Sequence, residues 1–269
     1  MSVEKAFARA RDEGRAALVG YLPAGFPDVQ GGIDALTTMV EAGCDVIEVG
    51  LPYTDPVMDG PTIQAAAQQA LDGGFRLADV FSTVEAVAAT GAPTVVMTYW
   101  NPVERYGVER FAQSLTDAGG AGLITPDLTP DYAPEWIAAA DERGLDKIFL
   151  VAPSSTDTRI DSTVAACRGF VYATAVMGVT GARATTSDLA GPLVERTKRA
   201  AAAHDLPVGV GLGVSNGDQA AEVASYADAV IVGSAFVRVL LDHADDRAAG
   251  LAALRALTED LADGVRRGR

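Results

Sequence analysis

Short apolar segments alternate with longer amphipathic segments along most of the chain. The short segments are rich in β-branched residues, as expected for strands that are buried on both faces. Between them, apolar residues recur at steps of three and four, which is typical of helices with one buried face. The pattern predicts eight strands, at Ala17 to Leu22, Val46 to Leu51, Thr94 to Tyr99, Gly122 to Thr125, Lys147 to Ala152, Phe170 to Ala175, Pro207 to Leu212 and Ala229 to Val232.

Eight strands that are each followed by a helix indicate the fold class. A doubly wound sheet usually has about five or six strands, whereas eight consecutive units are the pattern of a (β/α)₈ barrel. An amphipathic helix with Val3, Phe7 and Ala10 on its apolar face precedes the first strand. We therefore expect an α/β protein with a single (β/α)₈ TIM barrel domain over residues 1–269 and an additional N-terminal helix.

One predicted strand carries a carboxylate in its middle. Glu48 lies inside the segment Val46 to Leu51, whereas the other predicted strands have ionisable residues only at their ends. Apolar surroundings raise the pKa of a carboxyl group, so Glu48 is expected to hold a proton near neutral pH. No strand interior supplies a Lys or Arg to pair with it, which favours a functional role over a structural ion pair.

Asp59 lies in the glycine- and proline-rich loop after this strand. We expect it to be open to water and ionised, although a turn residue before Gly60 is an equally good interpretation. Two carboxyl groups whose surroundings separate their pKa values can act as one acid and one anion. Because the loops after the C-terminal strand ends build the active site of such barrels, Glu48 and Asp59 are candidates for that site.

Further candidates lie at the ends of other predicted strands. Tyr172 lies within the sixth strand, where its hydroxyl needs either a protein partner or a ligand. The segment after it, with Gly178, Gly181 and Arg183, is long enough for a lid or for an ordinary connection. Tyr99-Trp100-Asn101-Pro102 and Pro126-Asp127 are predicted to be loops that leave the third and fourth strands.

The last two strand ends are rich in glycine. Gly209-Val210-Gly211-Leu212-Gly213 ends the seventh strand, and Gly233-Ser234 directly precedes an apolar helix. Backbone N–H groups at glycines and at a helix N-terminus attract anions. These loops therefore predict a phosphate site without a Lys or Arg, and their spacing does not match a dinucleotide fingerprint.

Composition excludes several classes of protein. The formal net charge of −15 argues against a surface for nucleic acid or anionic lipid. Cys44 and Cys167 show no metal-binding spacing, and His204 and His243 are far apart, so a histidine-centred metal site or triad is not expected. The chain has no secretory signal core and no apolar run long enough to span a bilayer, so we expect a cytoplasmic protein.

Several motifs resemble those of a known family. Ile47 to Pro56, Asp59 to Gln64 and Gly178-Val179-Thr180-Gly181 resemble the signature of the tryptophan synthase alpha subunit family, and the resemblance extends over essentially the whole chain. It implies a lyase of tryptophan biosynthesis that cleaves indole-3-glycerol phosphate to indole and glyceraldehyde 3-phosphate without a metal or an organic cofactor. It also implies a tryptophan synthase beta subunit as partner, in an α₂β₂ heterotetramer, docked near Tyr53 to Met58, Asn101-Pro102 and the strand-four loop.

The resemblance further implies roles for individual residues. Glu48 would protonate indole C3, Asp59 would accept the indole N–H, and Tyr172 would orient Glu48 or the substrate. Four residues would hold the phosphate group, namely Gly181, Gly213, Gly233 and Ser234. Eight would line the indole and glycerol region, namely Tyr21, Ile63, Met97, Tyr99, Ile124, Thr125, Thr180 and Leu212.

The chain departs from the usual family pattern at two places, and other functions stay open. Tyr53-Thr54 stands where a Phe-Ser pair is more usual, and residues 173–177 are more apolar than in many members. A free-standing lyase that releases indole would use the same active site. Two further alternatives are a catalytically inactive phosphate-binding barrel that activates a partner and another phosphate-binding barrel enzyme of aromatic amino-acid biosynthesis. Neither would explain the Glu48 and Asp59 pair.

Overall fold

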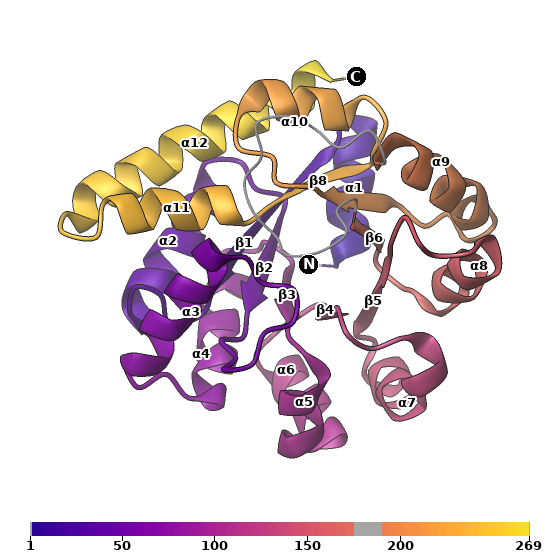
Figure 1. Ribbon diagram of the computed structural model, residues 1–269, viewed down its shortest axis with the longest axis horizontal. Helices are drawn as coiled ribbons and strands as arrows, with labels where there is room; N and C mark the ends of the chain where they lie inside the picture. The colour runs from indigo at the N-terminus through magenta and orange to yellow at the C-terminus, as the bar shows by residue number, and fades with distance from the viewer. Residues whose placement is uncertain (1, 175–189, 269) are drawn as a thin grey trace.

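The computed structural model describes residues 2–174 and 190–268, and these residues form the predicted barrel with its N-terminal helix (Figure 1). Eight parallel strands close into one sheet in the order of the sequence, with the last strand paired to the first. All eight predicted strands are present. Their bounds are β1 Ala17–Pro23, β2 Val46–Gly50, β3 Thr94–Met97, β4 Gly122–Thr125, β5 Asp146–Val151, β6 Val171–Thr174, β7 Val208–Gly211 and β8 Ala229–Val232.

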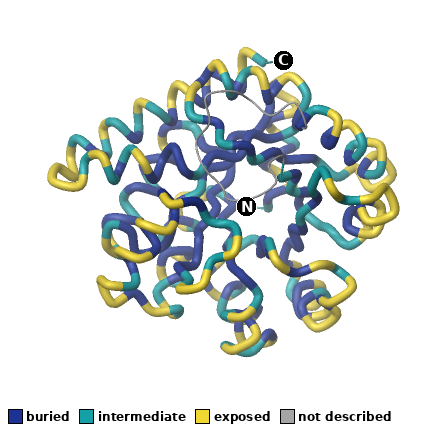
Figure 2. The backbone as a smooth tube through the Cα atoms, in the orientation of Figure 1, coloured by how far each residue is buried: buried dark blue, intermediate teal, exposed yellow. Residues whose placement is uncertain are grey.

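Helices surround the strands on all sides (Figure 1). The inner faces of the helices and the strands are buried, while the outer helix turns and the loops are exposed (Figure 2). Two short 3-10 helices, η1 Pro130–Tyr132 and η2 Ala202–His204, join them. The α-helices are α1 Val3–Asp12, α2 Val29–Glu41, α3 Pro61–Asp72, α4 Leu77–Ala88, α5 Trp100–Tyr106, α6 Val108–Asp117, α7 Pro134–Arg143, α8 Asp157–Ala166, α9 Ala190–Ala201, α10 Gly217–Ala224, α11 Ser234–Asp242 and α12 Arg247–Arg267.

The segment after β3 differs from the prediction. We expected a strand up to Tyr99 and then a loop, but the strand ends at Met97 and Tyr99 is the N-cap of α5. The backbone N–H of Trp100 is held by the carboxylate of Asp127, at 2.9 and 3.1 Å. Pro102 lies in the first helical turn, where a missing N–H breaks no intrahelical hydrogen bond. The segment that was predicted to be a loop therefore begins a helix, and Pro102 is compatible with that start.

Side chains inside the barrel form a core of their own. Alternate strand residues point inward, so that Val95, Ile124 and Ile148 belong to one inner cluster, together with Phe170 directly before β6. The residues between them pack against the surrounding helices in a separate outer cluster. Parallel strands are thus buried on both faces, which explains why they appear in the sequence as continuous apolar runs.

Helix α1 closes the N-terminal end of the barrel. Its apolar residues Val3, Ala6, Phe7 and Ala10 belong to the same inner cluster as the strand residues. The ring of Phe7 stacks on Phe170, with ring centroids 5.4 Å apart. The N-terminal half of the barrel is therefore filled by packed side chains, and a ligand can enter the interior from the C-terminal ends of the strands.

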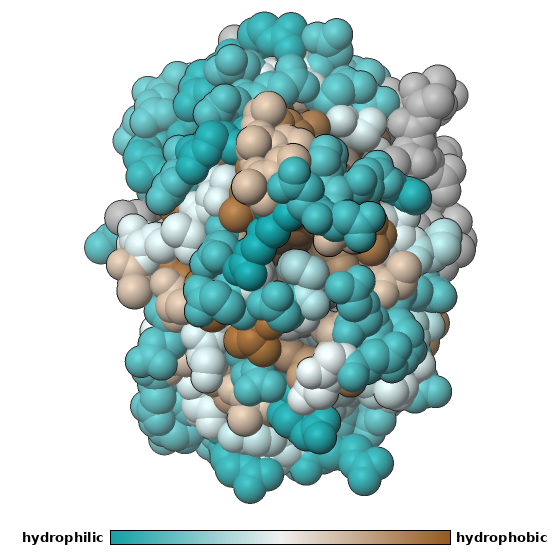
Figure 3. All heavy atoms as spheres, turned by 90° about the vertical axis from the view of Figure 1, so that its left-hand side faces the viewer, coloured by the Kyte–Doolittle hydropathy of each residue, from teal (hydrophilic) through white to brown (hydrophobic). Residues whose placement is uncertain are grey.

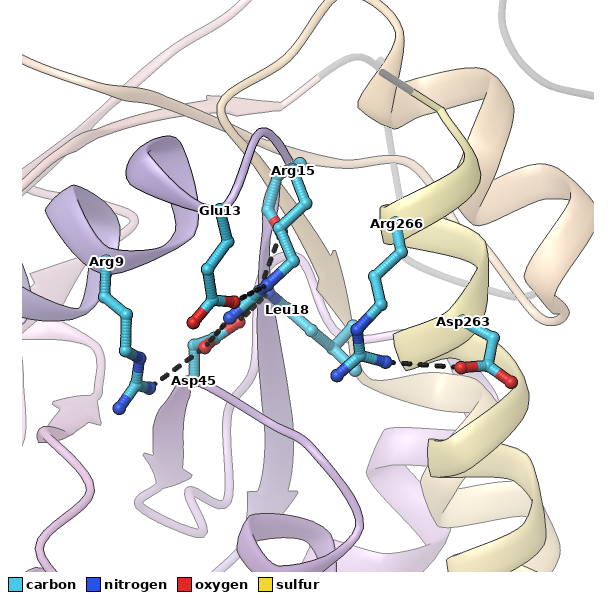
Figure 4. A network of polar contacts seen from close by, with 8 residues as sticks. Arg9, Glu13, Arg15, Leu18, Asp45, Asp263 and Arg266 are labelled. Carbon is cyan, nitrogen blue, oxygen red and sulfur yellow. Dashed lines mark hydrogen bonds and ion pairs between the residues drawn. The ribbon is translucent and has the colours of Figure 1, made fainter.

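A buried ion pair supports the same end of the barrel (Figure 4). Arg15 and Asp45 precede β1 and β2, and the Arg15 guanidinium contacts both carboxylate oxygens of Asp45, at 2.6 and 2.8 Å. The Leu18 N–H donates to Asp45 over 2.9 Å, and Arg9 of α1 reaches Asp45 over 3.1 Å. These contacts tie α1, β1 and β2 together at a point far along the strands from their C-terminal ends.

The flank that carries the outer ends of α11 and α12 is mainly hydrophilic. Figure 3 shows small, separate hydrophobic areas on this flank, with hydrophilic side chains between them. Within residues 2–174 and 190–268, no helix combines the length and the apolar character that crossing a bilayer requires.

Candidate active site

A cavity opens at the C-terminal ends of the strands. The space between its walls, with the open mouth included, is about 820 Å³. Most of the strands contribute to the wall, together with the loop after β2 and the N-terminal ends of α3 and α11. The lining residues are Tyr21, Glu48, Met58, Asp59, Ile63, Met97, Leu150, Tyr172, Thr174, Gly211, Leu212, Gly213, Ile231, Gly233 and Ser234.

Glu48 lies in the wall of this cavity as a buried carboxyl group. It follows the inward-facing Val46 by two residues in β2, so the alternation of the strand turns it into the barrel. Only 1% of the residue is exposed, and Oε2 has no hydrogen-bond partner among the described residues. None of the ion pairs within the described part of the chain includes Glu48. Burial alone raises the pKa of Glu48 to about 8, so the group is mostly protonated at pH 7.

Asp59 lines the same cavity but is less exposed than expected. It was predicted to be open to water, whereas the structure places it half-buried in the loop between β2 and α3. The hydroxyl of Tyr99 donates a hydrogen bond to Oδ1 over 2.9 Å. Burial raises the pKa of Asp59, and the Tyr99 hydrogen bond acts in the opposite direction because it stabilises the charged form.

Two tyrosine rings share the mouth of the barrel with these carboxyl groups. Tyr21 of β1 lies against Gly50, and Tyr172 of β6 lies against Gly211, where a Cβ would stand 2.9 Å from Tyr172 Cε1. Glycine is therefore required at these places for the rings to fit. Burial, and then the nearby charge of Glu48, raises the pKa of Tyr172 far above its ordinary value, so its hydroxyl stays protonated and can donate.

Backbone groups at the ends of β7 and β8 form the part of the cavity that suits an anion. Gly233 is the N-cap of α11, and Ser234 is its first residue. The first N–H groups of a helix have no intrahelical acceptor, and the helix dipole favours negative charge there. Gly213, whose φ of 82° favours glycine, turns the chain after β7 into the same wall. Among the described residues that line the cavity, none is a Lys or an Arg.

Some of the residues that were predicted to line the site do so in the structure, and others do not. Tyr21, Ile63, Met97 and Leu212 do line the cavity. Tyr99 is buried behind Asp59, and Ile124 lies in the inner core and is not part of the lining. Thr125 pairs in register with Phe149, which belongs to the outer cluster, and is not part of the lining. Thr180 and Gly181 lie outside the described residues.

Several lining residues were not predicted from the sequence. Met58, Leu150, Thr174, Gly211 and Ile231 all contribute to the wall. Leu150, Thr174 and Ile231 follow the inward-facing residues Ile148, Tyr172 and Ala229 by two positions. The alternation of inward- and outward-facing residues along a strand could therefore have identified these three residues from the sequence.

The arrangement combines three chemical functions in one cavity. A protonated carboxyl group can donate to a reacting carbon, a second carboxylate can stabilise positive charge, and a helix N-terminus can bind an anionic group. In the part of the chain that is described, no three His, Cys, Asp or Glu side chains are grouped so that they could hold a metal ion. Such a site fits acid–base chemistry on a phosphorylated, largely apolar substrate.

Comparisons with known proteins agree with this geometry. The family model described as "Tryptophan synthase alpha chain" matches residues 7–266. The tryptophan synthase alpha chain of Salinispora arenicola is 64% identical over 261 residues, which cover 97% of this chain and 96% of that protein. The corresponding protein of Acidothermus cellulolyticus is 61% identical over 266 residues, covering 99% of this chain and 97% of that protein.

Solved structures extend the similarity to three dimensions. A chain of Mycobacterium tuberculosis tryptophan synthase superposes with a TM-score of 0.91 at 56% identity, and the match covers 98% of both chains. A chain of the tryptophan synthase complex from Pyrococcus furiosus gives a TM-score of 0.83 at 32% identity, covering 92% of this chain and 98% of that one. On sequence and on fold, the chain belongs to the tryptophan synthase alpha chain family.

Proposed function

We propose that this chain is an indole-3-glycerol-phosphate lyase, which cleaves its substrate by retro-aldol chemistry to indole and glyceraldehyde 3-phosphate. The observation that carries the proposal is Glu48, a buried carboxyl group with a pKa of about 8 that shares a cavity with a second carboxyl group, Asp59. Family membership supports the same activity.

In the proposed reaction Glu48 acts first as an acid. It transfers its proton to indole C3, and positive charge spreads to the indole nitrogen. Asp59 accepts the indole N–H and stabilises that charge. The bond between C3 and the glycerol carbon then breaks, and its electron pair returns to the ring. The hydroxyl group on that glycerol carbon loses its proton to the Glu48 carboxylate, and the carbon becomes the aldehyde. This step restores the protonated Glu48 for the next cycle.

Tyr172 and the glycine-rich loops hold the reactants in place. The protonated hydroxyl of Tyr172 lies in the same cavity as Glu48 and is suited to orient that carboxyl group or the substrate. Gly213, Gly233 and Ser234 are assigned to the phosphate group because the N-terminus of α11 offers free N–H groups there. Gly181 is assigned to the same group on family resemblance.

We further propose that a tryptophan synthase beta subunit docks over the mouth of the barrel and receives the indole. Two large apolar side chains are exposed in the connections after β2 and β4, Val57 with 75% and Tyr132 with 79% of its surface accessible. Val57 belongs to the segment Tyr53 to Met58 and Tyr132 to the segment after β4, both of which are expected to contact the partner together with Asn101-Pro102. An α₂β₂ assembly in the cytoplasm is the expected form.

The proposal is tested by assaying the purified chain with indole-3-glycerol phosphate, alone and with a beta subunit. Cleavage that increases with the beta subunit is expected. Glu48→Gln and Asp59→Asn should each lower kcat by at least about 100-fold, within the range that general acid–base catalysis contributes. Absence of cleavage by the wild-type chain with its partner would refute the function. A fully active Glu48→Gln variant would refute the role of Glu48 as the acid. Equal rates with and without the partner would indicate a free-standing lyase.

A further inference from the structure

The hydroxyl group of Tyr99 lies between two consecutive residues of the loop after β2. It accepts the backbone N–H of Met58 over 2.9 Å and donates to Oδ1 of Asp59 over 2.9 Å. Because a backbone N–H can only donate, the phenol oxygen must be the acceptor in the first bond. Its single proton is then directed to Asp59, and the two bonds strengthen each other.

Tyr99 itself is held firmly. Only 5% of the residue is exposed, and its ring packs against Tyr53 with ring centroids 5.5 Å apart. The Tyr53 hydroxyl accepts a hydrogen bond from Asn101 over 2.7 Å. As the N-cap of α5, Tyr99 also directly precedes the Trp100 N–H that Asp127 holds. Asp59, in contrast, lies in a loop without regular secondary structure.

We propose that Tyr99 is a positioning residue that fixes the orientation of the Asp59 carboxylate and leaves its second oxygen, Oδ2, for the N–H of the ligand. Tyr99 does not line the cavity, so it acts through Asp59 and not by touching the ligand. The inference rests on the proposed function for the identity of that ligand. The contacts that support it are independent of that function.

The charge of Asp59 depends on the same hydrogen bond. Donation by Tyr99 favours the ionised carboxylate, while burial disfavours it. The other titratable groups in the cavity wall are Glu48, Tyr21 and Tyr172, each of which is held neutral by burial near pH 7. Loss of the Tyr99 hydroxyl leaves the effect of burial on Asp59 unopposed, so the pKa of Asp59 must rise.

Tyr99→Phe tests the inference because it removes the hydroxyl and keeps the ring. We expect kcat to fall at least about tenfold, with a smaller change in KM, since the lost interaction is needed most as charge develops on the ligand. The acid limb of kcat/KM should move to higher pH by about one unit, the scale of a hydrogen bond to a charged group. Tyr106→Phe is the matched control, because it removes a phenol hydroxyl that contacts Ser114 over 3.1 Å outside the cavity.

A direct titration separates the inference from the proposed function. The carboxyl ¹³C signal of Asp59, assigned with Asp59→Asn, should titrate at higher pH in Tyr99→Phe than in the parent chain. Site-specific replacement of Tyr99 by 3,5-difluorotyrosine, a stronger donor of similar size, should move the titration to lower pH even if the phenylalanine variant folds poorly. Unchanged titration in both would overturn the inference, whether or not the chain cleaves indole-3-glycerol phosphate. An inactive parent with the expected titration shifts would refute only the proposed function.

Discussion

The ring of Tyr21 lies so close to Gly50 that a Cβ on Gly50 would stand 2.6 Å from Tyr21 Cζ. Gly50 is the last residue of β2, two positions after Glu48, and therefore lies on the same face of the strand. The absence of a side chain at Gly50 thus allows an aromatic wall to form beside the acid. The size of one residue decides the shape of the site.

Gly50→Ala is expected to impair both packing and activity. The added methyl group must displace the Tyr21 ring into the cavity, and such overpacking costs roughly 1–3 kcal/mol of unfolding free energy. With Tyr21 displaced, kcat/KM should fall at least about tenfold. Gly191→Ala in α9 is the control, since no described residue outside its own helix lies within 4 Å of its Cβ position. That variant should keep the stability of the parent or gain up to about 1 kcal/mol, because alanine lowers the conformational entropy of the unfolded chain. Urea unfolding and steady-state kinetics measure both effects, and full activity of Gly50→Ala would contradict this view of the wall.

The lyase activity should decline at alkaline pH as Glu48 loses its proton. The proposed reaction needs Glu48 in its protonated form, and the pKa of Glu48 is raised to about 8. The profile of kcat/KM against pH should therefore have an alkaline limb near pH 8 in the free enzyme. In Glu48→Asp, whose residual activity still depends on a carboxyl group at this place, the limb should move with the new pKa. A profile that stays flat up to pH 9.5 would contradict the assignment.

Burial of Glu48 should also make stability depend on pH. The folded pKa of about 8 lies above the ordinary value of 4.5, so the folded state keeps a proton that the unfolded state loses between these pH values. Unfolding free energy must therefore fall as pH rises from about 4.5 to about 8, by roughly 3 kcal/mol at pH 7. Glu48→Gln lacks this dependence. The stability of the variant relative to the parent should increase between pH 5 and pH 8 in urea titrations, and a constant difference would argue against a neutral buried acid.

The ion pair at the closed end of the barrel should affect stability and spare catalysis. Asp45 is 3% exposed, and replacing it by Asn leaves the buried Arg15 guanidinium with only the half-exposed Glu13 as a charged partner. A loss of about 3 kcal/mol of unfolding free energy is expected, at the low end of the range for breaking a buried pair. Asp263→Asn breaks the exposed pair with Arg266 that is also drawn in Figure 4, and should change stability by less than about 1 kcal/mol. At a temperature where both variants are folded, KM should match the parent. A raised KM in Asp45→Asn alone would show that the two ends are coupled.

Much of the fold could be predicted because each signal is local. Strands buried on both faces appear as short apolar runs, and a charged residue inside one of them, Glu48, is conspicuous without knowledge of any neighbour. The same alternation could also have identified Leu150 and Ile231 as cavity residues. Pro102, in contrast, suggested a loop, because its place in the first helical turn depends on Asp127 from the next strand end.

The environment of Asp59 could not be read from the sequence for a related reason. Its loop composition predicts exposure, whereas in the structure the carboxylate is half-buried and contacts Tyr99, 40 residues away along the chain. Which oxygen receives the hydrogen bond, and which side chain supplies it, follows from how the loop after β2 folds against the start of α5. Such pairings between neighbouring strand exits carry no periodic signal.

The position of α1 affects where small molecules can enter and leave the barrel. Because this helix and the packed interior close the N-terminal end of the barrel, we expect substrate, indole and the phosphorylated aldehyde all to pass through the C-terminal end. Release of one product can then obstruct release of the other. A protein bound over this opening would determine the order of product release and the destination of indole.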